Sequence, residues 1–529
     1  MRLPRWGQLL VWLVFAVVVY LPAGQLIHEA LAGGRATSAI ESLFLTASQW
    51  SLLGRSVTLA AGVSLLAVLI GVPYALLCER TDLPGRAFFS LAYLVPLLVP
   101  PYLHAIVWGR LLAQNGPINQ FLMDLLRLSS APVDAHSLGG AVFVLALAYF
   151  PFVTLLAISG LKTLDASYEE AALMHRGAWQ TVKRVTLPMV RPHINAAALF
   201  VFVFAIIDFG VADVLRVQVY PVEIFIQFSA LYDEQAAIML SLPLLMVTAL
   251  AIALQVHTMR GRSYVSLQAG RGTTRRYRLG RARGVAAGLC GAILLFSVLV
   301  PVAALIDTAG PLQTYQKALD SSLEQILVSF ALALAAAIVM TALSVAVALA
   351  LFSAERLGRI VAEYLSQLAF AIPPIVLGIG MIKLWNRPET DWLYGSAVIL
   401  VLGYVAHFVP FTIRAVYSSL QQLDPRLLDA AVLTRRSNVT IGWRVLVPLL
   451  RNGLLTAFFI GFVLSTSELG VTLLVIPPGT ETIPIKIYNF MHYGAEQTVA
   501  ALGLMLIAVQ LLFAIALFGI GRWLGSSAT

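Results

Sequence analysis

Long apolar stretches alternate with short polar stretches along this 529-residue chain. An α-helix needs about twenty apolar residues to cross the hydrocarbon core of a bilayer. Twelve stretches of roughly that length or longer lie at about residues 8–27, 52–77, 88–109, 139–161, 195–215, 237–257, 284–306, 325–352, 365–385, 394–413, 453–475 and 498–520. The pattern predicts twelve membrane-spanning helices, in two sets of six.

The composition supports a membrane protein. Hydrophobic residues make up 59% of the chain and charged residues 12%, and the mean hydropathy is +0.86. A soluble globular protein carries a charged fraction of roughly a quarter. The expected fold class is therefore all-α, a polytopic membrane protein with about twelve transmembrane helices.

The two sets of six resemble each other in their polar and proline positions. Glu79-Arg80 follows the second stretch of the first set, as Glu355-Arg356 does in the second, and Pro100-Pro101 and Pro373-Pro374 each interrupt a third stretch. Proline removes a backbone donor and kinks a helix. We therefore predict a first half (1–259), a basic cytoplasmic linker (260–283) and a second half (284–529), related by a pseudo-two-fold axis along the membrane normal, with a pathway between them.

Each half also contains one conspicuous polar loop, at 164–188 and at 423–448. The first contains Glu170-Ala171-Ala172, Gly177 and Pro188, and the second contains Asp429-Ala430-Ala431 and Pro448. An acidic residue favours the positive end of a helix, and alanine both favours helix and lets a partner approach closely. The residue before a proline disfavours helical geometry, so we expect a helix to end before Pro188 and before Pro448.

This duplicated segment resembles the EAA loop of ABC importer permeases, in which a short helix docks into a cleft of the ATPase subunit. The family has glycine about six residues after the acidic position, whereas this chain has Arg176 and Arg435 there. The resemblance implies a type I permease fold. It also implies that Glu170, Ala171, Ala172, Gly177 and Pro188, with Asp429, Ala430, Ala431 and Pro448, dock two copies of a cytoplasmic ATPase.

Basic residues indicate the orientation, because lysine and arginine accumulate in cytoplasmic loops. With the N-terminus inside, nine of the 35 basic residues lie outside and 26 inside. Both polar loops and the basic linker then face the cytoplasm. We expect a multi-pass protein of the bacterial inner membrane with both termini cytoplasmic.

Two carboxylates fall inside predicted spans, where an ionisable group is a candidate for function. Asp208 and Glu468 each lie twenty residues after the proline of their loop. They could face each other across the axis as part of a pathway or gate, together with the neighbouring Gly210, Gly470 and Thr472. Alternatively, each could cap or pair with a neighbour in its own helix. The sequence leaves both interpretations open, and the metal ligands stay unknown.

The segments from Asp208 to Gly210 and from Glu468 to Thr482 are similar to those of fused-repeat permeases of ferric-iron importers. That resemblance implies a translocation pathway for ferric iron delivered by a periplasmic binding protein. Permeases for thiamine, phosphonate or polyamines look alike, so these substrates stay as alternatives.

Other function classes fit less well. No Gly-Lys dipeptide occurs, so the chain lacks a P-loop and a separate subunit must use the ATP. We expect no enzymatic activity and no cofactor bound by this chain. The arginine-rich linker is explained by topology and anionic headgroups without a nucleic acid. A secondary transporter driven by protons through Asp208 and Glu468 is the competing class, but it would not need duplicated docking loops.

Overall fold

The computed structural model describes residues 4–32, 46–259, 276–423 and 438–526. Within these ranges the regular structure is helical, apart from one β-bridge between Thr81 and Tyr277. In the same ranges ten helices are long and apolar enough to cross a membrane, and the number rises to twelve if each of two bent helix pairs is one span. The prediction of an all-α polytopic protein is confirmed.

Both bent pairs break at the predicted prolines. The pair Arg86–Leu98 and Pro101–Leu111 bends by 88°, and the pair Leu357–Ala371 and Pro374–Trp385 bends by 95°. Pro101 and Pro374 are the first residues of α6 (Pro101–Leu111) and α19 (Pro374–Trp385). Proline is well suited to that position, because the first residue of a helix has no intrahelical use for its N–H.

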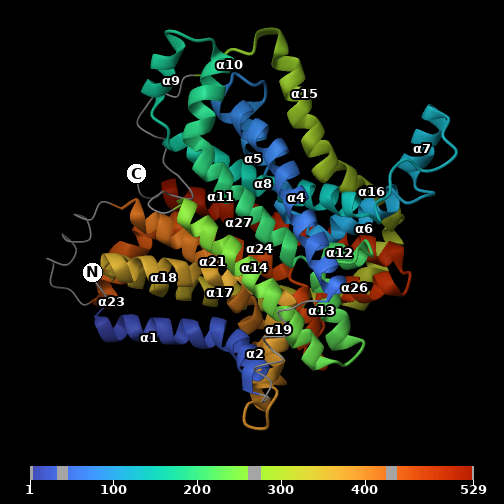
Figure 1. The fold of residues 1–529 in the computed structure, drawn as a ribbon, viewed down its shortest axis with the longest axis vertical. Helices are drawn as coiled ribbons and strands as arrows, with labels where there is room; N and C mark the ends of the chain where they lie inside the picture. The colour runs from blue at the N-terminus through green and yellow to red at the C-terminus, as the bar shows by residue number, and fades with distance from the viewer. Residues whose placement is uncertain (1–3, 33–45, 260–275, 424–437, 527–529) are drawn as a thin grey trace. The chain divides into compact units, whose positions relative to one another are not determined.

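The chain forms two compact units, each described here by itself. Unit 2 comprises Leu43–Thr308. Its main helices are α4 (Ala47–Arg80), α5 (Arg86–Ala92), α6, α7 (Pro117–Leu126), α8 (Leu138–Thr163), α11 (Leu187–Ile207), α13 (Tyr220–Ser229), α14 (Glu234–Met259), α15 (Arg283–Leu294) and α16 (Val300–Ala309). Its core is built from α4, α8 and α11, which pack on one another, and from α14, which packs on α11 (Figure 1).

Unit 1 comprises Met1–Ser42 and Ala309–Thr529. Its main helices are α1 (Arg5–Phe15), α2 (Leu21–Ala32), α17 (Leu312–Ser353), α18 (Arg356–Leu368), α19, α21 (Val398–Gln421), α24 (Val447–Thr466), α26 (Ile483–His492) and α27 (Glu496–Ser526). Packing among α17, α21, α24 and α27 forms its core. These four occupy the same places in the second half as α4, α8, α11 and α14 occupy in the first.

The compact units differ from the sequence halves in the first predicted span of each half. In unit 1, α1 packs on α17 and α2 packs on α19. The approach is close because Gly380 has no side chain: a Cβ there would lie 2.4 Å from the Pro22 carbonyl oxygen. In unit 2, α15 packs on α4, and the Phe296 ring lies 6.2 Å from that of Trp108. The predicted repeat divides the sequence at 260–283. In the structure, the first predicted span of each half packs against helices of the other half.

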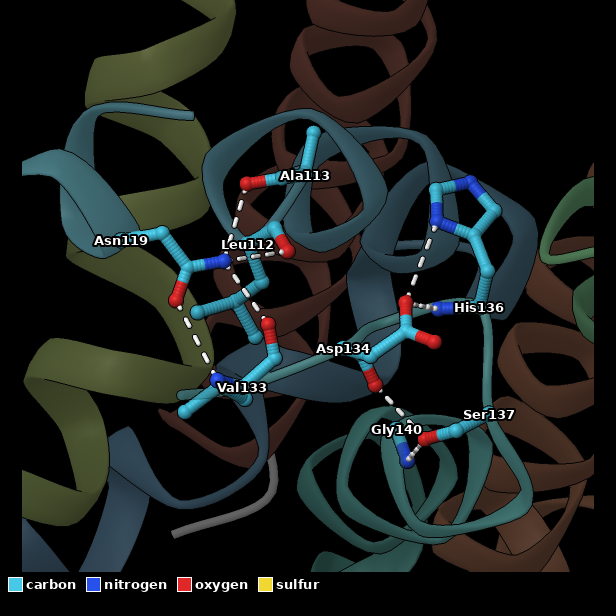
Figure 2. A network of polar contacts seen from close by, with 8 residues as sticks. All are labelled: Leu112, Ala113, Asn119, Val133, Asp134, His136, Ser137 and Gly140. Carbon is cyan, nitrogen blue, oxygen red and sulfur yellow. Dashed lines mark hydrogen bonds and ion pairs between the residues drawn. The ribbon is translucent and has the colours of Figure 1, made fainter. Parts of the chain in front are cut away.

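A polar network fixes the loop between α6 and α8, which carries α7 (Figure 2). The buried Asn119 amide nitrogen lies within hydrogen-bonding distance of the carbonyl oxygens of Leu112 (3.0 Å), Ala113 (2.9 Å) and Val133 (2.7 Å). Its side-chain oxygen accepts from the Val133 N–H. Ser137 then caps α8 by accepting from the Gly140 N–H at 3.1 Å. Since Asn119 lies in α7, the network anchors this helix to the end of α6.

Candidate functional site

The first polar loop contains a short helix, α9 (Ala166–Leu173), as predicted from its acidic and alanine residues. Asp165 is the N-cap residue, and its Oδ1 accepts from the Ser167 N–H at 3.0 Å. This hydrogen bond to the backbone lowers the pKa of the Asp165 carboxyl. The capping carboxylate is therefore Asp165, and Glu170 lies further along the helix.

The residues predicted to dock an ATPase in this loop lie mostly on the surface. Glu170, Ala171, Gly177 and Pro188 are exposed, and Ala172 is half-buried. Gly177 has an extended backbone (φ −71°, ψ 160°) that any residue can adopt, so the chain does not need glycine at this point.

Three large side chains on the same loop were not predicted as site residues. Tyr168, Met174 and Trp179 have exposed fractions of 56%, 81% and 74%. Aromatic residues and methionine are enriched in the buried parts of protein interfaces. Their presence in an otherwise polar loop could have indicated an interface from the sequence alone. The prediction overlooked them because it relied on the acidic and alanine residues. These three side chains and Glu170 are all exposed on this loop, and we call the set the docking surface after its predicted role.

The helix does not end before Pro188, contrary to the prediction. Residues 178–207 form one continuous helical span, in which the π-helical segment η3 (Val182–Thr186) leads directly into α11. A proline ring in an α-helix collides with the carbonyl four residues earlier. The wider π-helical turn changes that spacing, so the helix continues. The same arrangement occurs before Pro448, where the π-helical segment η7 (Gly442–Leu446) precedes α24.

Only part of the second loop lies among the residues that the structure describes. Asp429, Ala430 and Ala431 lie outside the described residues, so their predicted docking role stays a prediction. Pro448, near the start of α24, is described and exposed.

Another residue missed from the sequence is Glu169, next to Glu170 but fully buried. Its Oε2 lies 3.3 Å from the Arg80 Nε, and the two side chains are 0% and 1% exposed. The Thr186 hydroxyl donates to its Oε1 at 2.6 Å. The short helix α9 is therefore tied through Glu169 to α4 and to η3.

Asp208, predicted for the pathway or gate, is the C-cap residue of α11 and lies two residues before the next short helix, α12 (Gly210–Val214). Its Oδ1 accepts from the Val211 N–H at 2.8 Å, and its Oδ2 accepts from the Tyr149 hydroxyl at 3.2 Å. The first amides of a helix lack intrahelical acceptors, and a carboxylate at that end satisfies one of them. Asp208 thus holds the break between two helices.

Glu468 has the same place in unit 1, before α25 (Gly470–Val475). Its Oε1 accepts from the Val471 N–H at 2.7 Å, and its Oε2 accepts from the Thr472 N–H at 2.9 Å and from the Thr472 hydroxyl at 2.5 Å. Gly470 lets this break lie against α19, because a Cβ there would come within 2.7 Å of Pro374 Cβ. The alternative in which each carboxylate caps its own helix is observed in both units, whereas a pathway role stays a prediction.

In each unit the helix after that short one, α13 or α26, begins in the same way. The N–H of Tyr220, the first residue of α13, donates to Ser56 of α4 at 2.7 Å, and the N–H of Ile483, the first residue of α26, donates to Ser329 of α17 at 2.8 Å.

Among the described residues, no group of three or more His, Cys, Asp or Glu side chains is placed to hold a metal ion.

Comparison with known proteins finds similarity to permeases of binding-protein-dependent transport systems. The family model for the "binding-protein-dependent transport system inner membrane component" matches residues 338–527. The "Fe(3+)-transport system permease protein FbpB 2" of Haemophilus influenzae is 24% identical over 517 residues, covering 94% of this chain and 95% of that protein. The "Ferric transport system permease protein FbpB" of Actinobacillus pleuropneumoniae is 24% identical over 492 residues, covering 87% of this chain and 69% of that protein.

A third relative matches part of the chain. The "Spermidine/putrescine transport system permease protein PotC" of Escherichia coli is 28% identical over 200 residues, which cover 37% of this chain and 74% of that protein. The family model lies in the second half, and the two longer relatives align over most of the sequence. Together with the repeated spans and loops, these similarities support a multi-pass membrane protein that resembles ABC importer permeases.

Proposed function

We propose that this permease forms the translocation pathway for ferric iron delivered by an extracytoplasmic binding protein. Its similarity over 94% of its length to a permease named for Fe(3+) transport is the observation that carries this substrate. In the proposal, two copies of a separate cytoplasmic ATPase hydrolyse the ATP, and this chain binds no cofactor. The protein lies in the bacterial inner membrane with both termini in the cytoplasm.

The docking surface supports the ATPase partnership. Exposed Met174 and Trp179 offer apolar contact area, and Glu170 offers a charge beside them. A proton-driven transporter would not require such a surface. We therefore favour the ATP-driven mechanism, in which movement of the ATPases displaces the docking helices and opens the pathway alternately to the two sides.

The substrate is tested by deleting the gene and measuring uptake of radiolabelled ferric iron under chelation. We expect slower uptake and slower growth, with growth rescued by excess ferric salt. Expression of Asp208→Asn with Glu468→Gln should restore only part of the uptake at normal protein level. Normal iron uptake together with a defect for thiamine, phosphonate or a polyamine would discard iron and keep the permease. Co-purification of the ATPase with the tagged chain tests the partnership separately.

A further inference from the structure

We propose that the buried Arg80–Glu169 ion pair is the joint through which the first docking helix moves α4, α8 and α11 as one body. Arg80 is then a positioning residue for transport rather than part of the docking surface. This inference rests on the proposed coupling to an ATPase, but it concerns a contact within this chain.

The joint connects four elements. Arg80 is the last residue of α4, and its Nη2 donates to the Leu161 carbonyl oxygen in the last turn of α8 at 2.7 Å. Its Nε faces Glu169 of α9, and Glu169 accepts from Thr186 at the end of η3, which continues into α11. Two side chains therefore hold the docking helix to the cytoplasmic ends of three long helices.

Those three helices pack closely on one another at two glycines. A Cβ on Gly71 of α4 would lie 2.9 Å from Val153 Cβ of α8. A Cβ on Gly160 of α8 would lie 2.8 Å from side-chain atoms of both Val190 and His193 of α11. Closely packed interiors transmit displacement rather than absorb it. A force on α9 is therefore delivered to the whole group through the ion pair.

Burial makes the two partners dependent on each other. Arginine stays charged in proteins, so Arg80 cannot become neutral when its carboxylate is removed. Breaking a buried pair by removing one partner is strongly destabilising, whereas replacing both with apolar side chains is often tolerated. The two kinds of variant therefore separate a local folding defect from the loss of the joint.

The end of the inter-half linker meets the same residue. The Tyr277 N–H donates to the Arg80 carbonyl oxygen at 2.8 Å, and the Asp82 N–H donates to the Tyr277 carbonyl oxygen at 3.2 Å. This backbone pairing holds the position of the α4 end independently of the ion pair.

The second docking loop has no carboxylate at the corresponding position of its sequence. Leu428 aligns with Glu169 when Asp429 is aligned with Glu170. The ion-pair joint therefore belongs to the first loop, and the double variant Arg80→Met/Glu169→Leu gives that loop the apolar residue of the second.

The test uses the full chain reconstituted in proteoliposomes with its ATPase and with the binding protein loaded with ferric iron. For Glu169→Gln we expect the ratio of stimulated to basal ATP hydrolysis to fall at least about fivefold, the lower range of typical coupling energies. The ATPase should still co-purify. Amide hydrogen exchange in residues 166–173 should become faster, since α9 loses its anchor. The matched control for exchange is Glu170→Gln on the exposed face of α9, which should leave that exchange at the wild-type rate.

The double variant distinguishes loss of the joint from a local folding defect. We expect its thermal stability to return to the wild-type value while stimulation stays low. Wild-type stimulation in either Glu169→Gln or the double variant would overturn the proposal, and so would lost stimulation with unchanged exchange in α9. If the unaltered chain shows no ATPase binding or stimulation, the proposed function fails instead, and exchange in α9 still reports on the joint.

Discussion

Replacing Glu468 tests whether this carboxylate holds the helix break in unit 1. Glu468→Ala removes the acceptor for the N–H groups of Val471 and Thr472, which are both fully buried. A hydrogen bond to a charged group contributes about 1.5–3 kcal/mol, so two unsatisfied amides would cost about 3–6 kcal/mol. This is a large fraction of the roughly 5–15 kcal/mol that stabilises a typical domain.

The magnitude can be graded with two further variants. Glu468→Gln keeps one carbonyl oxygen as an acceptor but turns an NH₂ group toward the remaining donors, so its cost should be about half as large, roughly 1.5–3 kcal/mol. Thr472→Val removes only the hydroxyl, which donates to Glu468 and lies 3.1 Å from the Tyr404 hydroxyl, and should cost about 1 kcal/mol. The expected order of stability is wild type, Thr472→Val, Glu468→Gln, Glu468→Ala.

The assay is thermal unfolding in detergent. Gel filtration measures the fraction of protein that stays monodisperse after heating to each temperature. One kcal/mol shifts the midpoint by about 2–4 °C in a unit of this size, so Glu468→Ala should melt on the order of 10 °C below wild type. A shift within 2 °C or so would refute the capping role, because the lost hydrogen bonds would then contribute almost nothing. If Glu468→Gln loses much more transport than folded protein, the negative charge itself acts in the pathway.

Three further predictions concern other contacts. Gly380→Ala should loosen the first span and lower the stability of unit 1 by about 1–3 kcal/mol, because the new methyl group meets the α2 backbone. Gly24→Ala on α2 places its methyl group in open space and should not lower the stability. Cysteine cross-linking between α2 and α19 checks this. The hydrogen bond from Arg283 lowers the pKa of Asp82, so this contact stabilises the fold at neutral pH and is lost only as the pH falls through that lowered pKa. Asp82→Asn should therefore speed amide exchange at 276–280 already at pH 7. An unchanged exchange rate would contradict the prediction. Glu170→Arg should weaken ATPase co-purification without lowering the amount of inserted permease, and undiminished binding would exclude Glu170 from docking.

Local sequence signals predicted the local features well. The breaks at Pro101 and Pro374 follow from proline stereochemistry alone, and the short helix α9 follows from its acidic and alanine residues. The continuous helix through Pro188 was missed because a π-helical turn relieves the steric conflict on which the prediction depended. That relief has no simple residue signature.

Tertiary features were beyond the same reasoning. Every span is apolar, so composition does not specify which half the first span packs against, and the close approach at Gly380 becomes visible only with the fold. Arg80 and Glu169 lie far apart in sequence, and their pairing depends on where α4 ends. The repeat aligned Glu79-Arg80 with Glu355-Arg356, yet Arg80 ends α4 in a buried site while Glu355 is the exposed N-cap of α18.

The two halves are alike at the broken helices and differ in the sequences of their polar loops. Asp208 and Glu468 cap their breaks in the same manner, and Ser56 and Ser329 receive the next helix in the same manner, although the connecting segments differ in length. The docking end shows the opposite: the sequence places Leu428 where the first loop has its buried Glu169. A duplicated chain in one polypeptide can change one copy without changing the other, since the two docking loops are encoded separately. The broken helices keep one architecture, therefore, while the buried carboxylate of the first loop is not repeated in the sequence of the second.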